Sequence, residues 1–318
     1  MMQKRNLGNT GIWVSEIAFG GVEIGLPYGI GVNGKDDMIT EEDAVVLLQT
    51  AVAKGFNFFD TARMYGVSEN IMGKAFKQCR QDIVIATKCR HFRDAAGLLP
   101  SDREIRDLIH LSLRESLEAL QTDYLDLYML HQADMEILNC QVIADEMLRL
   151  KKSGVVRAIG VSTYNVKETR KAIEAEVWNV IQLPFNLMDQ RQQTLFESAA
   201  KNGVGIVVRS VLLKGLLSTR GTGLHPALHE VEEHIKKYGR LLQHKESLPK
   251  TAVKFALSFP EVSSVLVGID KESYLLESLD AADGHYMNKD RLQQARLLAY
   301  PDPAFLDLPY WDRMGWLR

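Results

Sequence analysis

Four side chains that can exchange or stabilise a proton follow apolar segments of this chain. Asp60 closes the segment Phe58-Phe59 and lies a few residues before Tyr65, while Lys88 and His131 each follow a longer apolar run. In a parallel barrel the carboxyl ends of all strands meet at one opening, where catalytic groups from different strands converge. We therefore expect these four side chains to share one site.

This combination is suited to proton transfer at a carbonyl oxygen. A tyrosine with a pKa of about 10 is a poor acid at neutral pH, but a nearby ammonium favours the phenolate. Lys88 is the candidate cation, Asp60 would hold it charged and aimed, and His131 would hydrogen-bond the substrate oxygen or relay a proton to Tyr65. Because no side chain can deliver a hydride, the set implies a nicotinamide cofactor.

The rest of the chain predicts the elements that would position these groups. Short apolar runs alternate with amphipathic stretches such as Glu41–Lys54 and Asp102–Leu120, the pattern of repeated βα units. The expected strands are Glu16–Gly20, Phe56–Phe59, Ile83–Thr87, Leu125–Leu130, Ala158–Val161, Val180–Leu183, Gly205–Arg209 and Ser264–Val267. They predict an α/β fold with one (β/α)8 barrel, residues 1–318 forming a single domain.

Three further segments have expected roles. Residues Arg5 to Val14 read as a hairpin around a turn rich in glycine. The glycine-rich stretch from Glu23 to Thr40 and the loop from Leu216 to Leu228 are expected beside the opening. The tail, from about residue 287, should pack on the barrel, and the following aromatics would either anchor it or line a substrate pocket: Phe305, Tyr310, Trp311 and Trp316.

Composition narrows the possible partners. A formal net charge of -3 gives no support to a nucleic-acid or anionic-membrane partner, which leaves a small molecule. Cys79, Cys89 and Cys140 have no CxxC spacing and are expected to be free thiols. No apolar run reaches the roughly 18 residues of a membrane span, so a cytoplasmic location is expected. Without an HExxH or Cys/His ligand spacing, no metal site is expected.

The four residues, in this order and with these strand contexts, resemble the aldo-keto reductase family. The resemblance runs from the turn Leu7-Gly8-Asn9-Thr10-Gly11 to about Ala281. It implies a catalytic set of Asp60, Tyr65, Lys88 and His131, with Tyr65 as general acid and base. It also implies that the hairpin closes the bottom of the barrel.

The resemblance further implies a site for NADP or NAD. Its expected residues are Gly21, Asp60, Ser162, Thr163, Gln182, Arg209, Ser210, Leu212, Lys214, Gly268, Asp270, Tyr274 and Ser278. Three positions depart from the family pattern. Thr163 replaces an asparagine, Arg209 replaces an aromatic that stacks on the nicotinamide, and Asp270 lies where many relatives place a cation for the 2'-phosphate. The family favours NADP, whereas an acid such as Asp270 accepts from a ribose hydroxyl and repels a phosphate.

These features predict hydride transfer between a nicotinamide and a carbonyl or alcohol carbon. Two alternatives remain open. The region from Phe19-Gly20-Gly21 to Tyr65 is similar to sugar-oxidising relatives, which suggests an NAD-dependent aldose 1-dehydrogenase. A cofactor-sensing binding module, like the potassium-channel β subunits, would retain the same fold and cofactor. No GxGxxG motif follows the first expected strand, which argues against a Rossmann domain.

Overall fold

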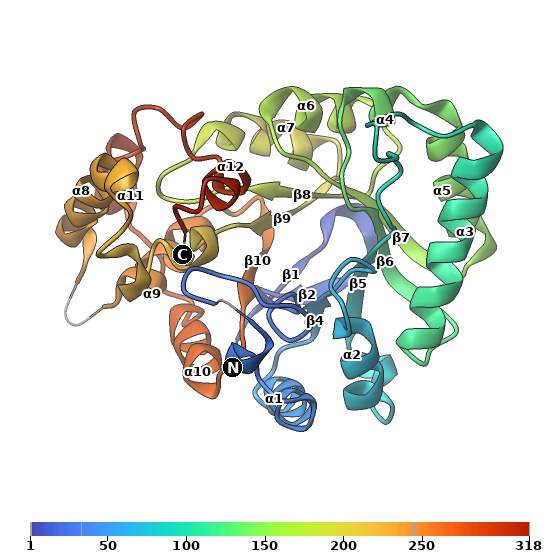
Figure 1. Ribbon diagram of the computed structural model, residues 1–318, viewed down its shortest axis with the longest axis horizontal. Helices are drawn as coiled ribbons and strands as arrows, with labels where there is room; N and C mark the ends of the chain where they lie inside the picture. The colour runs from blue at the N-terminus through green and yellow to red at the C-terminus, as the bar shows by residue number, and fades with distance from the viewer. Residues whose placement is uncertain (1, 33, 244–245, 318) are drawn as a thin grey trace.

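Parallel strands form a closed barrel at the centre of the computed structural model, which describes residues 2–32, 34–243 and 246–317 (Figure 1). Within this part of the chain the strands are paired in the order β10-β3-β4-β5-β6-β7-β8-β9, closing on β10. Their bounds are β3 Ile17–Gly20, β4 Phe58–Asp60, β5 Val84–Lys88, β6 Leu125–Leu130, β7 Val156–Ser162, β8 Val180–Pro184, β9 Gly205–Arg209 and β10 Val262–Gly268. The predicted (β/α)8 barrel is confirmed.

The strands are apolar because both of their faces are covered. In β6 every residue is buried, and successive side chains point to opposite faces. Leu127 and Met129 join a cluster inside the barrel, whereas Tyr128 and Leu130 pack outward against the helices. A strand held from both sides fixes the direction of the side chain at its end, which is the property a catalytic site requires.

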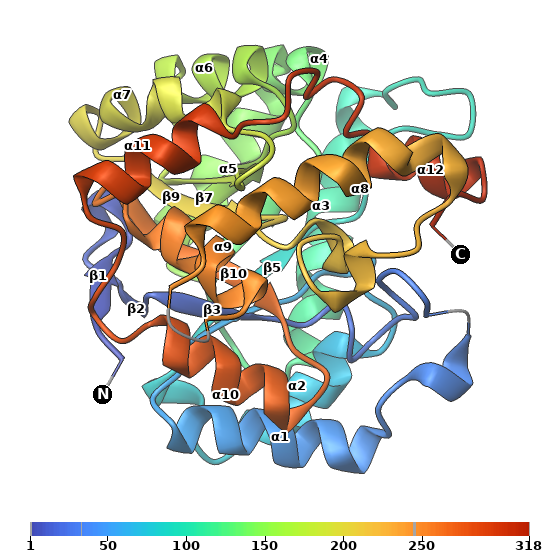
Figure 2. The same ribbon diagram turned by 90° about the vertical axis from the view of Figure 1, so that its left-hand side faces the viewer.

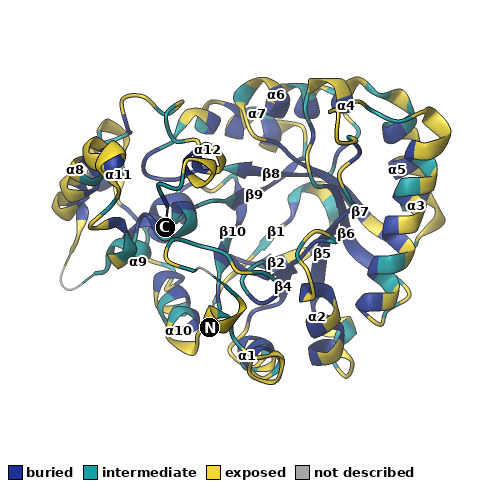
Figure 3. Cartoon of the chain, viewed as in Figure 1, coloured by how far each residue is buried: buried dark blue, intermediate teal, exposed yellow. Residues whose placement is uncertain are grey.

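Helices surround the barrel and turn their exposed faces to solvent (Figure 3). They are α1 Glu41–Ala53, α2 Ser68–Phe76, α3 Asp102–Ala119, α4 Met135–Asn139, α5 Gln141–Ser153, α6 Val166–Glu174, α7 Phe196–Lys201, α8 His229–Lys236, α9 Leu248–Leu257, α10 Glu272–Ala281, α11 Lys289–Leu297 and α12 Leu308–Arg313. The start of α3 is set by a capping box in which Ser101 and Glu104 satisfy each other's backbone N–H groups.

The strands β4, β5, β7, β8 and β10 each end one residue later than predicted, and in β4 and β5 the added residue is a catalytic candidate. Asp60 is the last residue of β4 and is paired with both Gly20 and Ala86. Lys88 is the last residue of β5 and is paired with Met129. Sequence reasoning placed both residues directly after the predicted strand ends. Here the ladder continues because the two charges neutralise each other.

An antiparallel hairpin closes the amino-terminal end of the barrel. Its strands are β1 Lys4–Asn6 and β2 Trp13–Ser15, and Leu7 and Ile12 are buried with the residues of the barrel interior. The Asn9 N–H donates to the Gly203 carbonyl at 2.8 Å. Figure 2 shows this hairpin and α12 at opposite ends of the molecule. The predicted hairpin is confirmed.

The aromatics of the tail anchor it on the barrel. Trp311 is fully buried and lies 5.4 Å from Phe305 between ring centroids, while Trp316 stacks on His225 at 5.9 Å. None of these three rings lines the large cavity described below. Of the two roles expected for them, the structure therefore supports anchoring.

Gly8 allows the hairpin to lie directly on the barrel, and its replacement is expected to destabilise the protein. A Cβ atom on residue 8 would lie 2.4 Å from the Gly205 nitrogen, and its φ is +57°. Gly11 also has positive φ, at +72°, but a Cβ there meets nothing within 4 Å. We expect Gly11→Ala to cost about 1–2 kcal/mol through φ alone and Gly8→Ala roughly 1–3 kcal/mol more through the clash.

Urea unfolding of the two variants beside the parent protein measures this difference. Equal midpoints for Gly8→Ala and Gly11→Ala would show that the hairpin can move away from the barrel without loss.

Candidate active site

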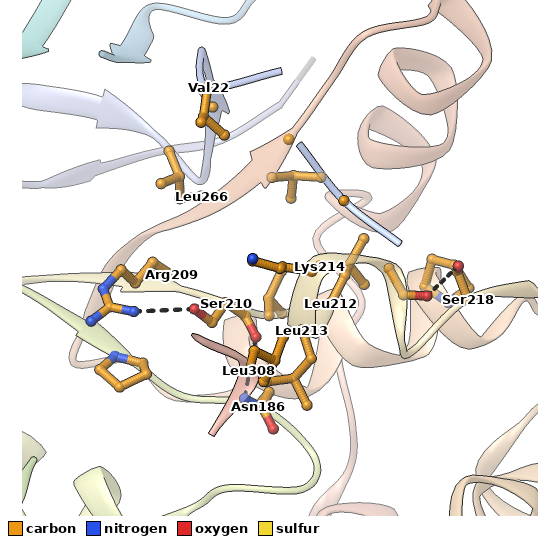
Figure 4. Close-up of a pocket in the computed structure, with 18 of the residues that line it drawn as sticks. Val22, Asn186, Arg209, Ser210, Leu212, Leu213, Lys214, Ser218, Leu266 and Leu308 are labelled. Atoms are coloured by element: carbon orange, nitrogen blue, oxygen red, sulfur yellow. Dashed lines mark hydrogen bonds between the residues drawn. The ribbon is translucent and has the colours of Figure 1, made fainter. Parts of the chain in front are cut away.

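A cavity of about 940 Å³ opens at the carboxyl end of the barrel (Figure 4). Its wall includes the last residues of five strands: Gly20, Ser162, Pro184, Arg209 and Gly268. Tyr65 and His131, which follow β4 and β6, also line it. The cavity therefore lies where the topology brings the strand ends together.

Asp60 and Lys88 form a buried ion pair beneath this cavity. The Lys88 Nζ donates to Asp60 Oδ1 at 2.5 Å and to the Thr61 carbonyl at 3.0 Å, and both side chains are 1% exposed. The second oxygen of Asp60 accepts from Gln182 Nε2 at 2.8 Å. Because both carboxylate oxygens have partners, Asp60 has one orientation and holds the ammonium in place.

Tyr65 and His131 lie directly beside this pair. The Lys88 Nζ is 4.9 Å from the centre of the Tyr65 ring, and the Tyr65 and His131 rings meet edge to face with centroids 5.3 Å apart. His91 makes a similar edge contact with His131 at 4.9 Å. The structure thus brings all four predicted residues together.

Lys88 was expected to lower the pKa of Tyr65, but in the structure this pKa is raised. Burial raises the pKa of Tyr65 well above its ordinary value, and the charge of Asp60 raises it further. Burial also lowers the pKa of Lys88, against the opposing effect of Asp60. Lys88 lies against the ring face and its charge is compensated by Asp60, so burial dominates. In the empty cavity Tyr65 therefore keeps its proton throughout the neutral range.

His131 is a neutral hydrogen-bonding group in this site. Burial lowers its pKa to about 2, with smaller contributions from the charges of Lys88, His91 and Arg209. Its Nδ1 is buried and has no hydrogen-bond partner among the described residues. A neutral imidazole can donate from one ring nitrogen and accept at the other. Of the two predicted roles, hydrogen bonding to a substrate oxygen fits this state, because a proton relay through imidazolium would require a much higher pKa.

Most of the residues predicted to bind a cofactor line the cavity: Ser162, Gln182, Arg209, Ser210, Leu212, Lys214, Gly268, Asp270, Tyr274 and Ser278. Gly21, Asp60 and Thr163 do not line it. The Gly21 N–H donates to the Asp60 carbonyl at 2.9 Å, so Gly21 connects two strand ends. The Thr163 hydroxyl is buried and hydrogen-bonded to that of Thr169 in α6 at 2.7 Å, which leaves it turned to the helix layer.

Arg209 is held by three contacts and is not a solvated side chain. It donates to the Thr163 carbonyl at 2.9 Å and to Ser210 Oγ at 3.2 Å, and its guanidinium lies 4.4 Å from the centre of the Tyr164 ring. Figure 4 shows Arg209 directed at Ser210, whose carbonyl accepts from Asn186. A cation therefore takes the position that an aromatic occupies in the pattern expected for the family.

Comparison with known proteins agrees with this arrangement. Residues 16–295 match the sequence profile of the Aldo/keto reductase family. The chain belongs to this family. It is 30% identical to L-galactose dehydrogenase of Arabidopsis thaliana, over 94% of this chain and 95% of that protein. It superposes on the holo form of aldo-keto reductase AKR11C1 from Bacillus halodurans with a TM-score of 0.78 and 27% identity, covering 94% and 97% of the two chains.

A third relative belongs to a different functional class. The chain is 28% identical to a probable voltage-gated potassium channel subunit beta of Oryza sativa subsp. japonica, over 89% of this chain and 92% of that protein. Aldo-keto reductases are oxidoreductases that act on small-molecule carbonyl compounds with a nicotinamide cofactor, and this chain has the fold of that family.

Sequence reasoning missed several residues that line this aldo-keto reductase cavity. Glu23, Tyr164 and Arg220 contribute to its wall, and so does Lys250 from α9, which is paired with Asp280 at 2.5 Å. Lys250 was missed because α9 precedes β10 and reaches the cavity only through the packing of α9 against α10. In the sequence, only the glycine-rich composition after β3 indicated that the segment with Glu23 could lie beside the cavity.

Two hydrogen bonds connect the loops on either side of β10. The Ile30 N–H donates to the Lys214 carbonyl at 3.0 Å, and Arg220 Nη1 donates to the Ile30 carbonyl at 3.1 Å. These loops follow β3 and β9, which are the neighbours of β10 in the barrel. The contact therefore forms a bridge beside the end of β10, and we call it the loop bridge.

Other features of the described residues bear on the remaining expectations. The three cysteines are free, as predicted, and burial raises the pKa of the Cys89 thiol to about 12. Within the described ranges no cluster of three or more His, Cys, Asp or Glu side chains is arranged to hold a metal. No helix in the described part of the chain has both the length and the apolar character needed to cross a membrane.

The Asp60–Lys88 pair predicts a large effect of removing one partner. Lys88→Met leaves a buried carboxylate without its cation, and we expect a loss of about 3–5 kcal/mol in the free energy of unfolding. The double variant Lys88→Met/Asp60→Asn should regain part of this loss, because the uncompensated charge is gone. Urea unfolding of both proteins measures the difference.

Lys201 provides a matched control. It is paired with Glu197 on the surface, where both side chains are more than 70% exposed, and Lys201→Met should have little measurable effect. Similar losses for the two lysine variants would contradict a special role for the buried pair.

Proposed function

We propose that this protein is an NAD(P)-dependent aldo-keto reductase that interconverts a carbonyl compound and its alcohol, with Tyr65 as the general acid and base. The observation that carries the proposal is the complete group of Tyr65, His131 and the Asp60–Lys88 pair at the wall and floor of one cavity. A structural role alone would not require a buried ion pair beneath an accessible phenol.

The chain's own residues would then act as follows. Tyr65 holds its proton at neutral pH because burial and Asp60 raise its pKa, and so it can donate that proton to a substrate oxygen. His131, neutral under the same conditions, would orient that oxygen by a hydrogen bond. Lys88 would stabilise the negative charge left on Tyr65 after the transfer. In the oxidative direction Tyr65 would first have to lose its proton to solvent, and the phenolate, stabilised by Lys88, would then accept the proton of the alcohol.

A nicotinamide cofactor, when bound, supplies or accepts the hydride. Ser162, the last residue of β7, and Gln182 in β8, which is bonded to Asp60, would hold the nicotinamide. Ser210, Leu212 and Lys214 follow β9 and would hold the diphosphate, for which Lys214 provides a positive charge. Asp270, Tyr274 and Ser278 follow β10 and would hold the adenosine. The fit is supported by the buried Nδ1 of His131, which has no hydrogen-bond partner among the described residues and could bind a polar ligand group.

A sugar is the second candidate substrate. Near the catalytic group the cavity is lined by hydroxyl, amide and guanidinium groups, including those of Tyr28, Tyr164, Asn186 and Arg209, which suit a polyhydroxylated ligand. The similarity to L-galactose dehydrogenase also favours this reading. The protein would then act as an NAD-dependent aldose 1-dehydrogenase. A cofactor-sensing binding module, as the potassium-channel relative suggests, would bind the dinucleotide but turn over slowly with every substrate.

The proposal is tested by following nicotinamide absorbance with the purified protein. Aldehydes and ketones are assayed with NADH and NADPH, and aldoses with both oxidised cofactors. Turnover of a carbonyl supports the reductase, and turnover only of aldoses supports the dehydrogenase. Tight cofactor binding without turnover of any substrate would favour the binding module and contradict the enzyme.

Tyr65→Phe should abolish turnover while leaving cofactor affinity nearly unchanged. The substitution removes only the hydroxyl, and general acid catalysis contributes about 10²- to 10⁴-fold to rate. Single-turnover kinetics with the best substrate measure the effect, and cofactor fluorescence titration measures binding. Tyr164→Phe, a phenol on the same cavity wall, is the matched control and should retain most activity. A fully active Tyr65→Phe protein would rule out Tyr65 as the acid.

Asp270→Ser should shift cofactor preference toward NADPH. If Asp270 lies beside the adenosine ribose, removing its charge relieves repulsion of the 2'-phosphate by on the order of 1 kcal/mol, or about fivefold in the ratio of kcat/KM values. Glu272→Ser, an exposed acid at the start of α10, should leave the ratio unchanged. An unaltered preference in Asp270→Ser would show that Asp270 does not face the ribose.

A further inference from the structure

Glu23 occupies an unusual place for an acid. It lies in the loop after β3 and contributes to the wall of the cavity. Its carboxyl group packs on Gly268 at the end of β10, where a Cβ atom would lie 1.8 Å from Glu23 Oε1. The side chain thus fills space that exists only because residue 268 is a glycine.

The carboxyl group of Glu23 is poorly compensated. Its Oε2 is buried and has no hydrogen-bond partner among the described residues, although the residue as a whole is partly exposed. Burial raises the pKa of Glu23 to about 8, a backbone hydrogen bond within Glu23 lowers it, and the charges of Asp270 and Asp60 raise it again. Arg220 acts in the opposite direction but is the smallest of these effects.

The position of Glu23 matches the middle of the proposed dinucleotide. Two acids, Asp60 and Asp270, affect it from the catalytic side and from the end of β10. Its loop is joined through the loop bridge to Lys214, the residue proposed to hold the diphosphate. An ionised carboxylate at this place would repel a diphosphate, whereas a protonated carboxyl has an O–H to donate and could bind a phosphate oxygen.

Building on the proposed cofactor site, we propose that Glu23 is a cofactor-binding residue that holds a proton in the complex and donates it in a hydrogen bond to the diphosphate. Cofactor binding is then linked to proton uptake. No feature of Glu23 is needed for the hydride transfer itself, so its role is in affinity and not in the chemical step.

The direction of the pH dependence follows from this linkage. Below the Glu23 pKa of about 8, the Glu23 carboxyl group is already protonated before the cofactor binds. Cofactor affinity is therefore constant in this range. Above it the proton is lost from the free protein and must be regained on binding, so the affinity falls by up to about tenfold per pH unit.

Other titratable groups around Glu23 do not reproduce this behaviour. Tyr28 and Tyr65 face it, but burial raises the pKa of each well above this range. A variant of Glu23 leaves Asp60, Asp270, Arg220 and Lys214 in place. A pH dependence that disappears with Glu23 can therefore be assigned to Glu23.

The test measures cofactor dissociation constants from about pH 6.5 to about pH 9.5, a window that spans the Glu23 pKa. NADH and NADPH are each titrated against the parent protein, Glu23→Gln and the control Glu277→Gln, which changes an acid elsewhere on the cavity wall. We expect affinity to fall above about pH 8 for the parent and for Glu277→Gln, and to be independent of pH for Glu23→Gln.

Calorimetry of the parent protein provides a second measurement that needs no variant. Above the Glu23 pKa, binding enthalpies in buffers with different ionisation enthalpies should reveal uptake of up to one proton per cofactor. Constant affinity and no proton uptake in the parent would overturn the role of Glu23 while leaving the cofactor site intact. Failure of the parent to bind either cofactor at any pH would overturn the proposed function and this inference with it.

Discussion

The buried ion pair of Asp60 and Lys88 is the interaction on which the site depends. Two charges are tolerated inside the barrel because Lys88 Nζ donates to one oxygen of Asp60 and Gln182 satisfies the remaining carboxylate oxygen. Each charge is costly without the other, so the pair restricts how β4, β5 and β8 can be arranged. This pair also determines the surroundings of Tyr65 and His131. The Tyr65 ring lies against the Lys88 ammonium. Burial and nearby positive charges lower the pKa of His131.

The barrel and its loops make different contributions to this site. Strands covered on both faces hold Asp60 and Lys88 with little freedom, and the hairpin fills the opposite end of the interior. The proposed cofactor and substrate surfaces come mainly from loops and from the tail, including Leu306 and Leu308. Changes in these outer segments can alter what is bound without disturbing the proton-transfer group.

Much of this arrangement could be predicted from the sequence because it depends on local pattern. Apolar runs covered on two faces identify strands, and a charged residue at the end of such a run identifies a strand-end site. The pKa of Tyr65 could not be predicted, because it depends on burial by segments far apart in the chain. The Thr163 hydroxyl forms a hydrogen bond with Thr169 in α6. The sequence does not indicate that the Thr163 side chain points towards this helix. Glu23 and Lys250 needed the three-dimensional packing to place them on the cavity wall.

The loop bridge has a consequence for the timing of turnover. Ile30 is bonded to both Lys214 and Arg220 beside the end of β10, where the middle of a dinucleotide is proposed to lie. A long ligand beneath this connection can leave only when its hydrogen bonds open, whereas a small substrate at the catalytic side need not cross it. The two ligands would then dissociate at different rates, and the dinucleotide would stay bound while the product leaves. Loop opening, rather than proton transfer, would set the pace of the cycle.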